Sequence, residues 1–159
     1  MKDYKISNEQ LIMKTTLPFQ TIEKMEIRHD INAHVSIKMR VIVNEEDHQE
    51  ILSRDWSDAN ITVLRKGEEG LPLFAGSIER LVGHKENQLL IMEVFGIGET
   101  IRLDRRKKRQ SFQNIEMTYK QVARKVIDGY QEVGLIWVIS GDKEIGAPLF
   151  QYDETVWEF

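Results

Sequence analysis

The chain has 159 residues, enough for one ordinary domain or for one domain and part of a second. It has no cysteine, which excludes disulfides and thiolate metal sites. The formal net charge of −4 gives no steering toward nucleic acid or acidic membranes, and the apolar stretches are too short to span a bilayer. No apolar segment follows the N-terminus as in a secretory signal, so we expect a soluble protein made in the cytoplasm.

The clearest strand signal lies between Ile31 and Val43. Apolar side chains occupy every second position of this stretch, separated mostly by polar ones: Ile31, Ala33, Val35, Ile37, Met39, Val41 and Val43. Because side chains alternate faces along a strand, the pattern predicts one buried face and one wet face. A long strand with one wet face suits a curved antiparallel sheet or a barrel.

Three further strands are predicted at intervals marked by turn residues: Asn60–Lys66, Leu73–Val82 and Leu89–Phe95. Glycine-rich or polar turns separate them at 67–70 and 83–87. Gly76 falls inside a strand pattern, which suggests a bulge or a bend at a barrel corner. These elements predict a mostly β fold, an antiparallel β-barrel followed by a short helix and the start of a second barrel-type unit.

The helix is predicted after residue 118. Thr118 and Gln121 have the spacing of a capping box, in which each side chain satisfies a free backbone amide of the first turn. Apolar residues then recur at helical spacing from Tyr119 to Tyr130 and form one stripe. Leu135–Ile139 is predicted to be a strand.

The last predicted element is a second helix. An extended piece runs through Tyr152, and Asp153 is in a position to cap a helix that begins at Glu154. The chain stops within this amphipathic pattern, at Trp157-Glu158-Phe159. Two large aromatic side chains at the end of an element expose apolar surface with no partner, so we expect a fragment of a longer protein.

No set of residues predicts a catalytic, cofactor or metal site. The acidic stretch 45–50 includes His48, but its spacing matches no metal-binding loop and is typical of an acidic turn that opens a short helix. His29 and His34 are five residues apart on the expected strand, so they face opposite sides. The glycines at 96–98 lack the third glycine of a dinucleotide loop, and no serine lies in a nucleophile elbow. We therefore expect that the protein is not an enzyme.

A basic run is the strongest charge feature and supplies the candidate interface residues: Arg102, Arg105, Arg106, Lys107, Lys108 and Arg109. One interpretation is contact with nucleic-acid phosphates, but only Phe112 lies near enough to stack on a base. A second is a solvated or interfacial loop, which is the usual role of such runs in a net-acidic protein. A third is contact with an acidic surface of a partner subunit.

Four segments resemble, in order, the motifs of one protein family. They are Ile31-Asn32-Ala33-His34, Leu73-Phe74-Ala75-Gly76-Ser77-Ile78, Arg109-Gln110-Ser111-Phe112-Gln113 and Gln151-Tyr152-Asp153-Glu154-Thr155 with Trp157 and Phe159. They are similar to segments of the baseplate hub proteins of contractile injection systems, the family of the VgrG-like spike proteins and the phage late control D proteins. The third segment departs from the family pattern by one residue inserted between Arg109 and Ser111.

The resemblance implies a structural role without catalytic residues. It implies a homotrimer whose subunits each carry two β-barrel tube domains, so that a pseudo-sixfold ring adapts a sixfold tail tube to a threefold spike. Residues 1–105 are then the first tube domain, and 106–159 hold a linker, the helix and the beginning of a truncated second unit. The implied partners are other copies, a tail tube protein and a spike protein or domain, within a phage tail-like or secretion particle. A nucleic-acid-binding β-barrel that uses the basic run is the alternative.

Overall fold

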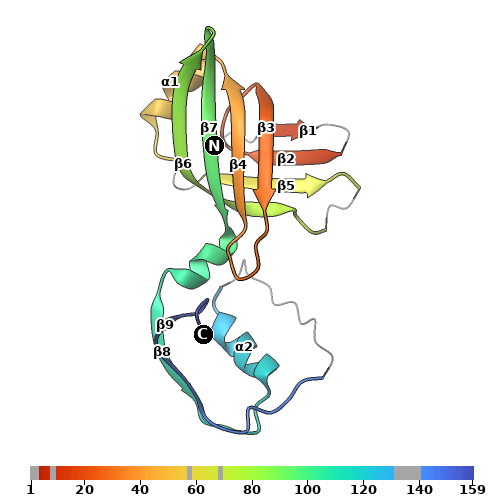
Figure 1. The fold of residues 1–159 in the computed structure, drawn as a ribbon, viewed down its shortest axis with the longest axis vertical. Coiled ribbons are helices and arrows are strands. Elements are labelled where there is room, and N and C mark those ends of the chain that lie inside the picture. Colours follow the sequence, from red (N-terminus) through yellow and green to blue (C-terminus); the bar gives the residue numbers. More distant parts are fainter. Residues whose placement is uncertain (1–3, 8–9, 57–58, 68–69, 131–140) are drawn as a thin grey trace. The chain divides into compact units, whose positions relative to one another are not determined.

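The computed structural model describes residues 4–7, 10–56, 59–67, 70–130 and 141–159 (Figure 1). The chain forms two compact units, Met1–Gly98 and Glu99–Phe159. Strands predominate over helices in the first unit and in the described residues as a whole, and the expected mostly β fold is confirmed.

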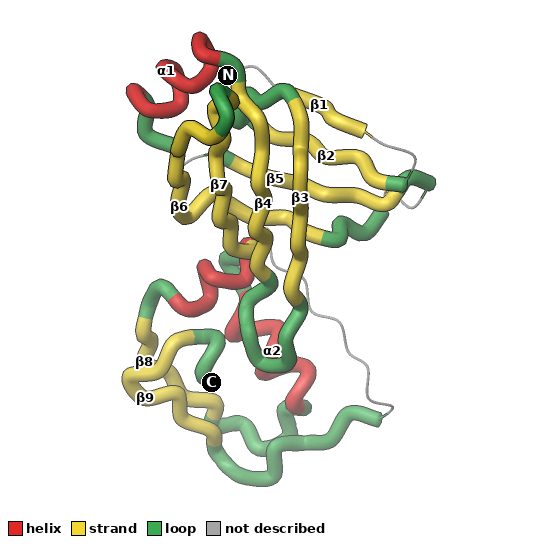
Figure 2. The backbone as a smooth tube through the Cα atoms, turned by 45° about the horizontal axis from the view of Figure 1, so that its top comes forward, coloured by secondary structure: helices red, strands yellow, loops and turns green. Residues whose placement is uncertain are grey.

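One antiparallel sheet of seven strands makes up most of the first unit, in the order β1-β2-β5-β6-β7-β4-β3. A single helix of this unit, α1 (Glu45–Ser53), follows β4. Figures 1 and 2 show β1, β2 and β5 running across the direction of β3, β4 and β7, so the sheet curls into a half-barrel. The strands are β1 (Tyr4–Ser7), β2 (Leu11–Thr15), β3 (Thr21–Arg28), β4 (Ser36–Val43), β5 (Asn60–Arg65), β6 (Phe74–Glu86) and β7 (Leu89–Gly98).

The prediction of a strand from Ile31 to Val43 is wrong for the first part of this stretch. β4 begins at Ser36, and Ile31 lies in the preceding turn with 93% of its surface exposed. Asn32 has a φ of +57°, a left-handed conformation that interrupts regular strand geometry and that asparagine tolerates better than most residues. From Ile37 to Val43 the expected alternation holds, because these side chains line the core.

The turn expected at 83–87 is also misplaced. β6 continues through Gly83 to Glu86, and the chain reverses at Asn87 and Gln88, both with positive φ. The expected short helix after the acidic stretch is confirmed, since Asn44 caps α1 by accepting a hydrogen bond from the Asp47 amide at 2.7 Å.

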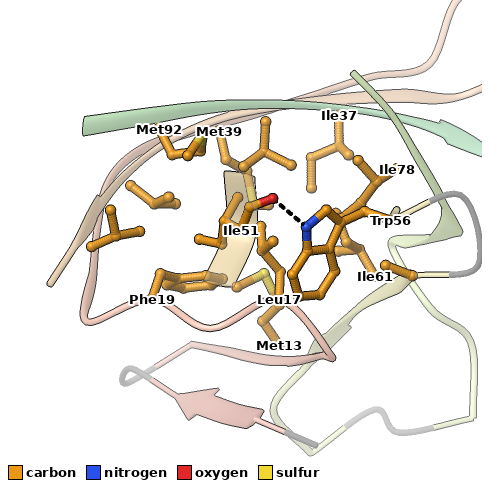
Figure 3. Packing of buried hydrophobic residues seen from close by; sticks show 14 of the residues in the cluster. Met13, Leu17, Phe19, Ile37, Met39, Ile51, Trp56, Ile61, Ile78 and Met92 are labelled. Carbon is orange, nitrogen blue, oxygen red and sulfur yellow. Dashed lines mark hydrogen bonds between the residues drawn. The ribbon is translucent and has the colours of Figure 1, made fainter. Parts of the chain in front are cut away.

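The core of the first unit lies inside the curled sheet (Figure 3). Met13 of β2 and Leu17 approach it from one side, and Met39 of β4 and Met92 of β7 approach it from the other. The Trp56 indole Nε1 donates a hydrogen bond to the Ile51 carbonyl at 2.8 Å, so the ring fills the core without leaving its polar atom unsatisfied. This bond ties the end of α1 to the core.

The sheet bends at Gly76, as the sequence predicts for a barrel corner. Gly76 pairs with Ile61 of β5 and also with Gly98 of β7, so one residue serves both halves of the sheet. A Cβ atom at Gly76 would lie 2.0 Å from the carbonyl oxygen of Ile97. The corner therefore needs a residue without a side chain.

The outer face of β3, β4, β7 and β6 is polar and tied together by ion pairs. Arg40 on β4 contacts Glu23 of β3 at 2.6 Å and Glu86 of β6 at 2.5 Å. The hydrogen bond from Arg40, followed by its charge, lowers the pKa of Glu86 from its usual value. The hydrogen bond from Arg28 likewise lowers the pKa of Glu26.

The second unit is a two-stranded antiparallel sheet with a helix. It comprises the short 3-10 helix η1 (Glu99–Asp104), β8 (Lys107–Phe112), α2 (Tyr119–Ile127) and β9 (Leu149–Thr155). The capping box of α2 is confirmed: Thr118 Oγ1 accepts from the Gln121 amide, and the Gln121 side chain accepts from the Thr118 amide. The buried residues of this unit are Leu103, Phe112, Val122, Val126, Ile145 and Val156.

Two expectations for the C-terminal part have different outcomes. The helix expected at Glu154 is wrong, because β9 continues to Thr155. Asp153, the expected cap, has a φ of +57° next to a register shift in the β8–β9 ladder, so it marks an irregularity within a strand. The strand expected at Leu135–Ile139 lies outside the described residues.

Replacing Gly76 by alanine should strongly destabilise the first unit. The new methyl group would collide with the Ile97 backbone, so we expect Gly76→Ala to lower the free energy of unfolding by about 2–4 kcal/mol. Gly70→Ala is the matched control, because nothing lies within 4 Å of a Cβ built there. Urea unfolding followed by circular dichroism measures both, and equal effects of the two changes would contradict the corner constraint.

The Arg40 ion pairs predict a pH dependence. Lowered carboxylate pKa values contribute stability that is present above the ordinary value of 4.5 and is lost as the pH falls through the lowered folded values. Arg40→Gln should therefore lower the melting temperature at pH 7, and its difference from the parent protein should shrink below pH 4.5 as Glu86 becomes protonated. Lys14→Gln on the exposed side of β2 is the control, and a pH-independent effect of Arg40→Gln would contradict the prediction.

Candidate interaction surface

The basic run does not form one loop. Arg102 lies in η1, Arg105 and Arg106 lie in the short connection, and the last three basic residues belong to β8. Arg102 contacts Glu99 three residues earlier at 2.5 Å, which supports the turn of η1. Leu103 fixes the end of η1, because its side chain is buried and its carbonyl accepts from the amides of Val156 and Trp157 at 3.0 and 3.3 Å.

One part of the run faces the partner strand β9. Lys107 and Arg109 are exposed and both approach Asp153, at 3.8 and 3.6 Å. The Arg109 guanidinium also lies over the Tyr152 ring, 4.9 Å from its centroid. Asp153 therefore offsets part of their charge within the β8–β9 pair, through exposed ion pairs of small energetic value.

The other part lines a depression of about 460 Å³ near the end of α2. We call it the basic depression and define its cations as Arg102, Arg105, Arg106 and Lys108. Asp128, Gly129 and Tyr130 complete its lining, and Lys108 Nζ lies 4.8 Å from the centre of the Tyr130 ring. Cations at this position also complement the negative end of the helix dipole of α2.

A buried polar cluster holds β8 and β9 in place. The Gln151 side chain is only 1% exposed and donates to the carbonyls of Glu154 and Thr155, at 3.0 and 2.9 Å. Its own carbonyl accepts from the Gln110 side chain at 2.7 Å. Thr155 Oγ1 contacts Asp104 Oδ1 at 2.6 Å, which links β9 to η1. The cluster thus fixes the two segments that carry the basic run.

No metal site is visible in the part of the chain that the structure describes, where no three histidine or carboxylate side chains gather as ligands. The two histidines expected on one strand are on none: His29 follows the end of β3, and His34 precedes β4. The His29 ring instead contacts the carbonyl oxygen of Leu73 at 3.0 Å. None of the helices among the described residues is long and apolar enough to cross a membrane.

Sequence comparison finds no relatives for this chain. No protein-family model matches it. No curated protein matches it either. What is known of its relationships therefore comes from the fold.

Solved structures of tail proteins have a similar fold. The tail protein from Neisseria meningitidis MC58 matches with a TM-score of 0.63 and 16% identity, over 87% of this chain and 40% of that one. The 43 kDa tail protein of prophage MuSo2 from Shewanella oneidensis matches with a TM-score of 0.61 and 16% identity, over 94% and 48%. At such identities the likeness shows the fold alone.

A third solved structure comes from a secretion apparatus. The E. coli c3393 protein is a component of the type VI secretion system and has structural similarity to the T4 bacteriophage tail proteins gp27 and gp5. It matches with a TM-score of 0.55 and 12% identity, over 99% of this chain and 40% of that one. The present chain thus spans less than half the length of each of these three structures.

Removal of the buried glutamine should loosen the second unit. Gln151→Leu removes the acceptor of the Gln110 amide and a donor to the carbonyls of Glu154 and Thr155. The Thr155 carbonyl keeps the Phe159 amide at 3.2 Å, so we expect a loss of about 1–3 kcal/mol in the free energy of unfolding of this unit. Gln113→Leu, an exposed position just after β8, is the matched control. Hydrogen exchange of the β8 and β9 amides measures the effect, and unchanged protection in Gln151→Leu would contradict it.

Proposed function

We propose that the chain belongs to a structural baseplate hub component of a contractile injection machine, of the VgrG-like and late control D kind. In this role three copies form a ring that adapts a sixfold tail tube to a threefold spike. The observation that carries the proposal is the curled antiparallel sheet of the first unit followed by a smaller unit, an arrangement matched over 87–99% of the chain by two tail proteins and a secretion component.

The proposed role assigns to this chain a first tube domain and the beginning of a second one, and the two units support this division. The first unit is a half-barrel with a polar outer face, as expected of a ring wall that meets water on one side. The described residues of the second unit form a sheet of two strands, and an apolar groove of about 470 Å³ lies beside α2, lined in part by Leu103, Val122 and Val126. A small sheet beside a helix with an apolar groove is what the beginning of a second barrel would present.

The proposed role is non-catalytic and takes place within a particle. The buried polar side chain of Gln151 has a structural role, because it joins β9 to β8 through Gln110. The implied partners are other copies of the protein, a tail tube protein and a spike protein or domain. We therefore expect to find the protein within an assembled phage tail-like or secretion particle.

The mass of the full-length protein in solution, measured by light scattering, tests the proposed homotrimer. We expect a mass three times that of one chain, because a threefold ring needs three subunits with identical contacts. A mass of one chain across the accessible concentration range would contradict the role. Filter binding to single-stranded DNA over a salt titration provides the control, since tight binding with a steep salt slope would favour the nucleic-acid alternative.

A further inference from the structure

Two of the four cations of the basic depression have no ion pair or ring contact among the described residues. Arg102 has Glu99, and Lys108 lies over the Tyr130 ring. Arg105 and Arg106 are exposed and, among the described residues, their side chains form no ion pair. Among the described residues of the lining, Asp128 is the one carboxylate. The depression therefore carries a surplus of positive charge at a fixed position.

The first turn of α1 carries the opposite charge. Glu45, Glu46 and Asp47 are consecutive, and Glu50 follows one turn later. Glu45 and Glu46 are exposed and form no ion pair with other described residues. Glu50 contacts Arg54 at 3.7 Å. The first unit as a whole has 16 acidic and 12 basic side chains, whereas the second has ten of each, six of its basic ones in the run.

From this complementarity we propose that the basic depression of one copy binds the acidic first turn of α1 of a second copy. The inference rests on the proposed homo-oligomer and names its contact. Each copy then carries one acidic and one basic partner surface, so the contact is heterologous and closes into a ring when the rotation between copies allows it. Opposed charge of this kind steers the encounter and fixes the register more than it adds affinity.

The details of the depression favour a carboxylate partner over nucleic acid. Lys108 Nζ lies over one face of the Tyr130 ring and competes with a base for that face. Arg105 and Arg106 offer planar donors that match carboxylates, and exposed glutamates of a helix end meet that requirement.

Disulfide trapping tests the contact directly, because the chain has no cysteine of its own. Gln49→Cys places one thiol beside the acidic turn, and Asp128→Cys places the other in the depression without removing a cation. We expect the two single variants, mixed under mild oxidation, to form the mixed dimer about tenfold more than control pairs. The controls replace one partner by Gln20→Cys or Glu116→Cys, which are exposed positions outside both surfaces.

Matched charge removal shows whether the depression itself is responsible. Arg105→Gln with Arg106→Gln in the Asp128→Cys variant should reduce the mixed dimer by about tenfold. Lys107→Gln with Arg109→Gln removes the same charge from the same run, but from the side that faces Asp153, and should change the yield by less than about twofold. Arg105→Glu with Arg106→Glu should lose the dimer and recover it against a partner with Glu45→Arg and Glu46→Arg.

Several results would overturn the inference. A protein that is trimeric in full length but gives no trapping above the control pairs would refute this contact while leaving the proposed ring intact. A full-length monomer would refute both. Trapping within a single chain carrying both cysteines at high dilution, with none between copies, would assign the contact to one molecule. Single-stranded DNA binding that Arg105→Gln with Arg106→Gln abolishes, without trapping, would assign the depression to nucleic acid.

Discussion

The close approach of two backbone segments at Gly76 determines the shape of the first unit. β6 pairs with β5 on one side and β7 on the other, and Gly76 belongs to both pairings. The carbonyl of Ile97 occupies the space that a side chain would fill, so β6 and β7 approach each other closely there. The sheet curls as a result and encloses the core around Met39 and Met92, which leaves the opposite face of β4 and β7 to charged residues. The separation of a dry and a wet face follows from this corner.

The elements that could be predicted from the sequence are those with strong local periodicity or a local cap. β4 from Ile37 onward and the capping box at Thr118 follow from contacts within a few residues or from burial of one face. The alternation at Ile31 has no such basis, because Asn32 turns the chain. β1, β2 and β3 carry a weaker signal, and β3 lies at the sheet edge with charged residues along it. The end of β9 resembled the start of a helix, because aspartate is a common N-cap residue. In the structure Asp153 instead adopts a positive φ within the strand.

The basic run could be identified from the sequence, but its division into two surfaces could not. The division depends on Asp153 and Tyr152 in β9 and on Asp128 and Tyr130 after α2, which are distant in sequence from the run. Only the pairing of β8 with β9 and the position of α2 bring these groups together. The buried Gln151 was likewise noted only as part of a motif, although its bond with Gln110 joins β8 to β9 and its two other bonds hold the end of β9.

The same pairing determines which charges are available to another molecule. Because the hydrogen bond between Gln110 and Gln151 joins β8 to β9, Asp153 lies within reach of Lys107 and Arg109 and offsets part of their charge. Arg105 and Arg106 lie before the strand, where β9 supplies no carboxylate among the described residues. A run of six cations is thereby reduced to a small group with surplus charge at the end of α2. Such localisation suits a contact that must form in one register, because a diffuse positive strip would accept an acidic surface in many positions.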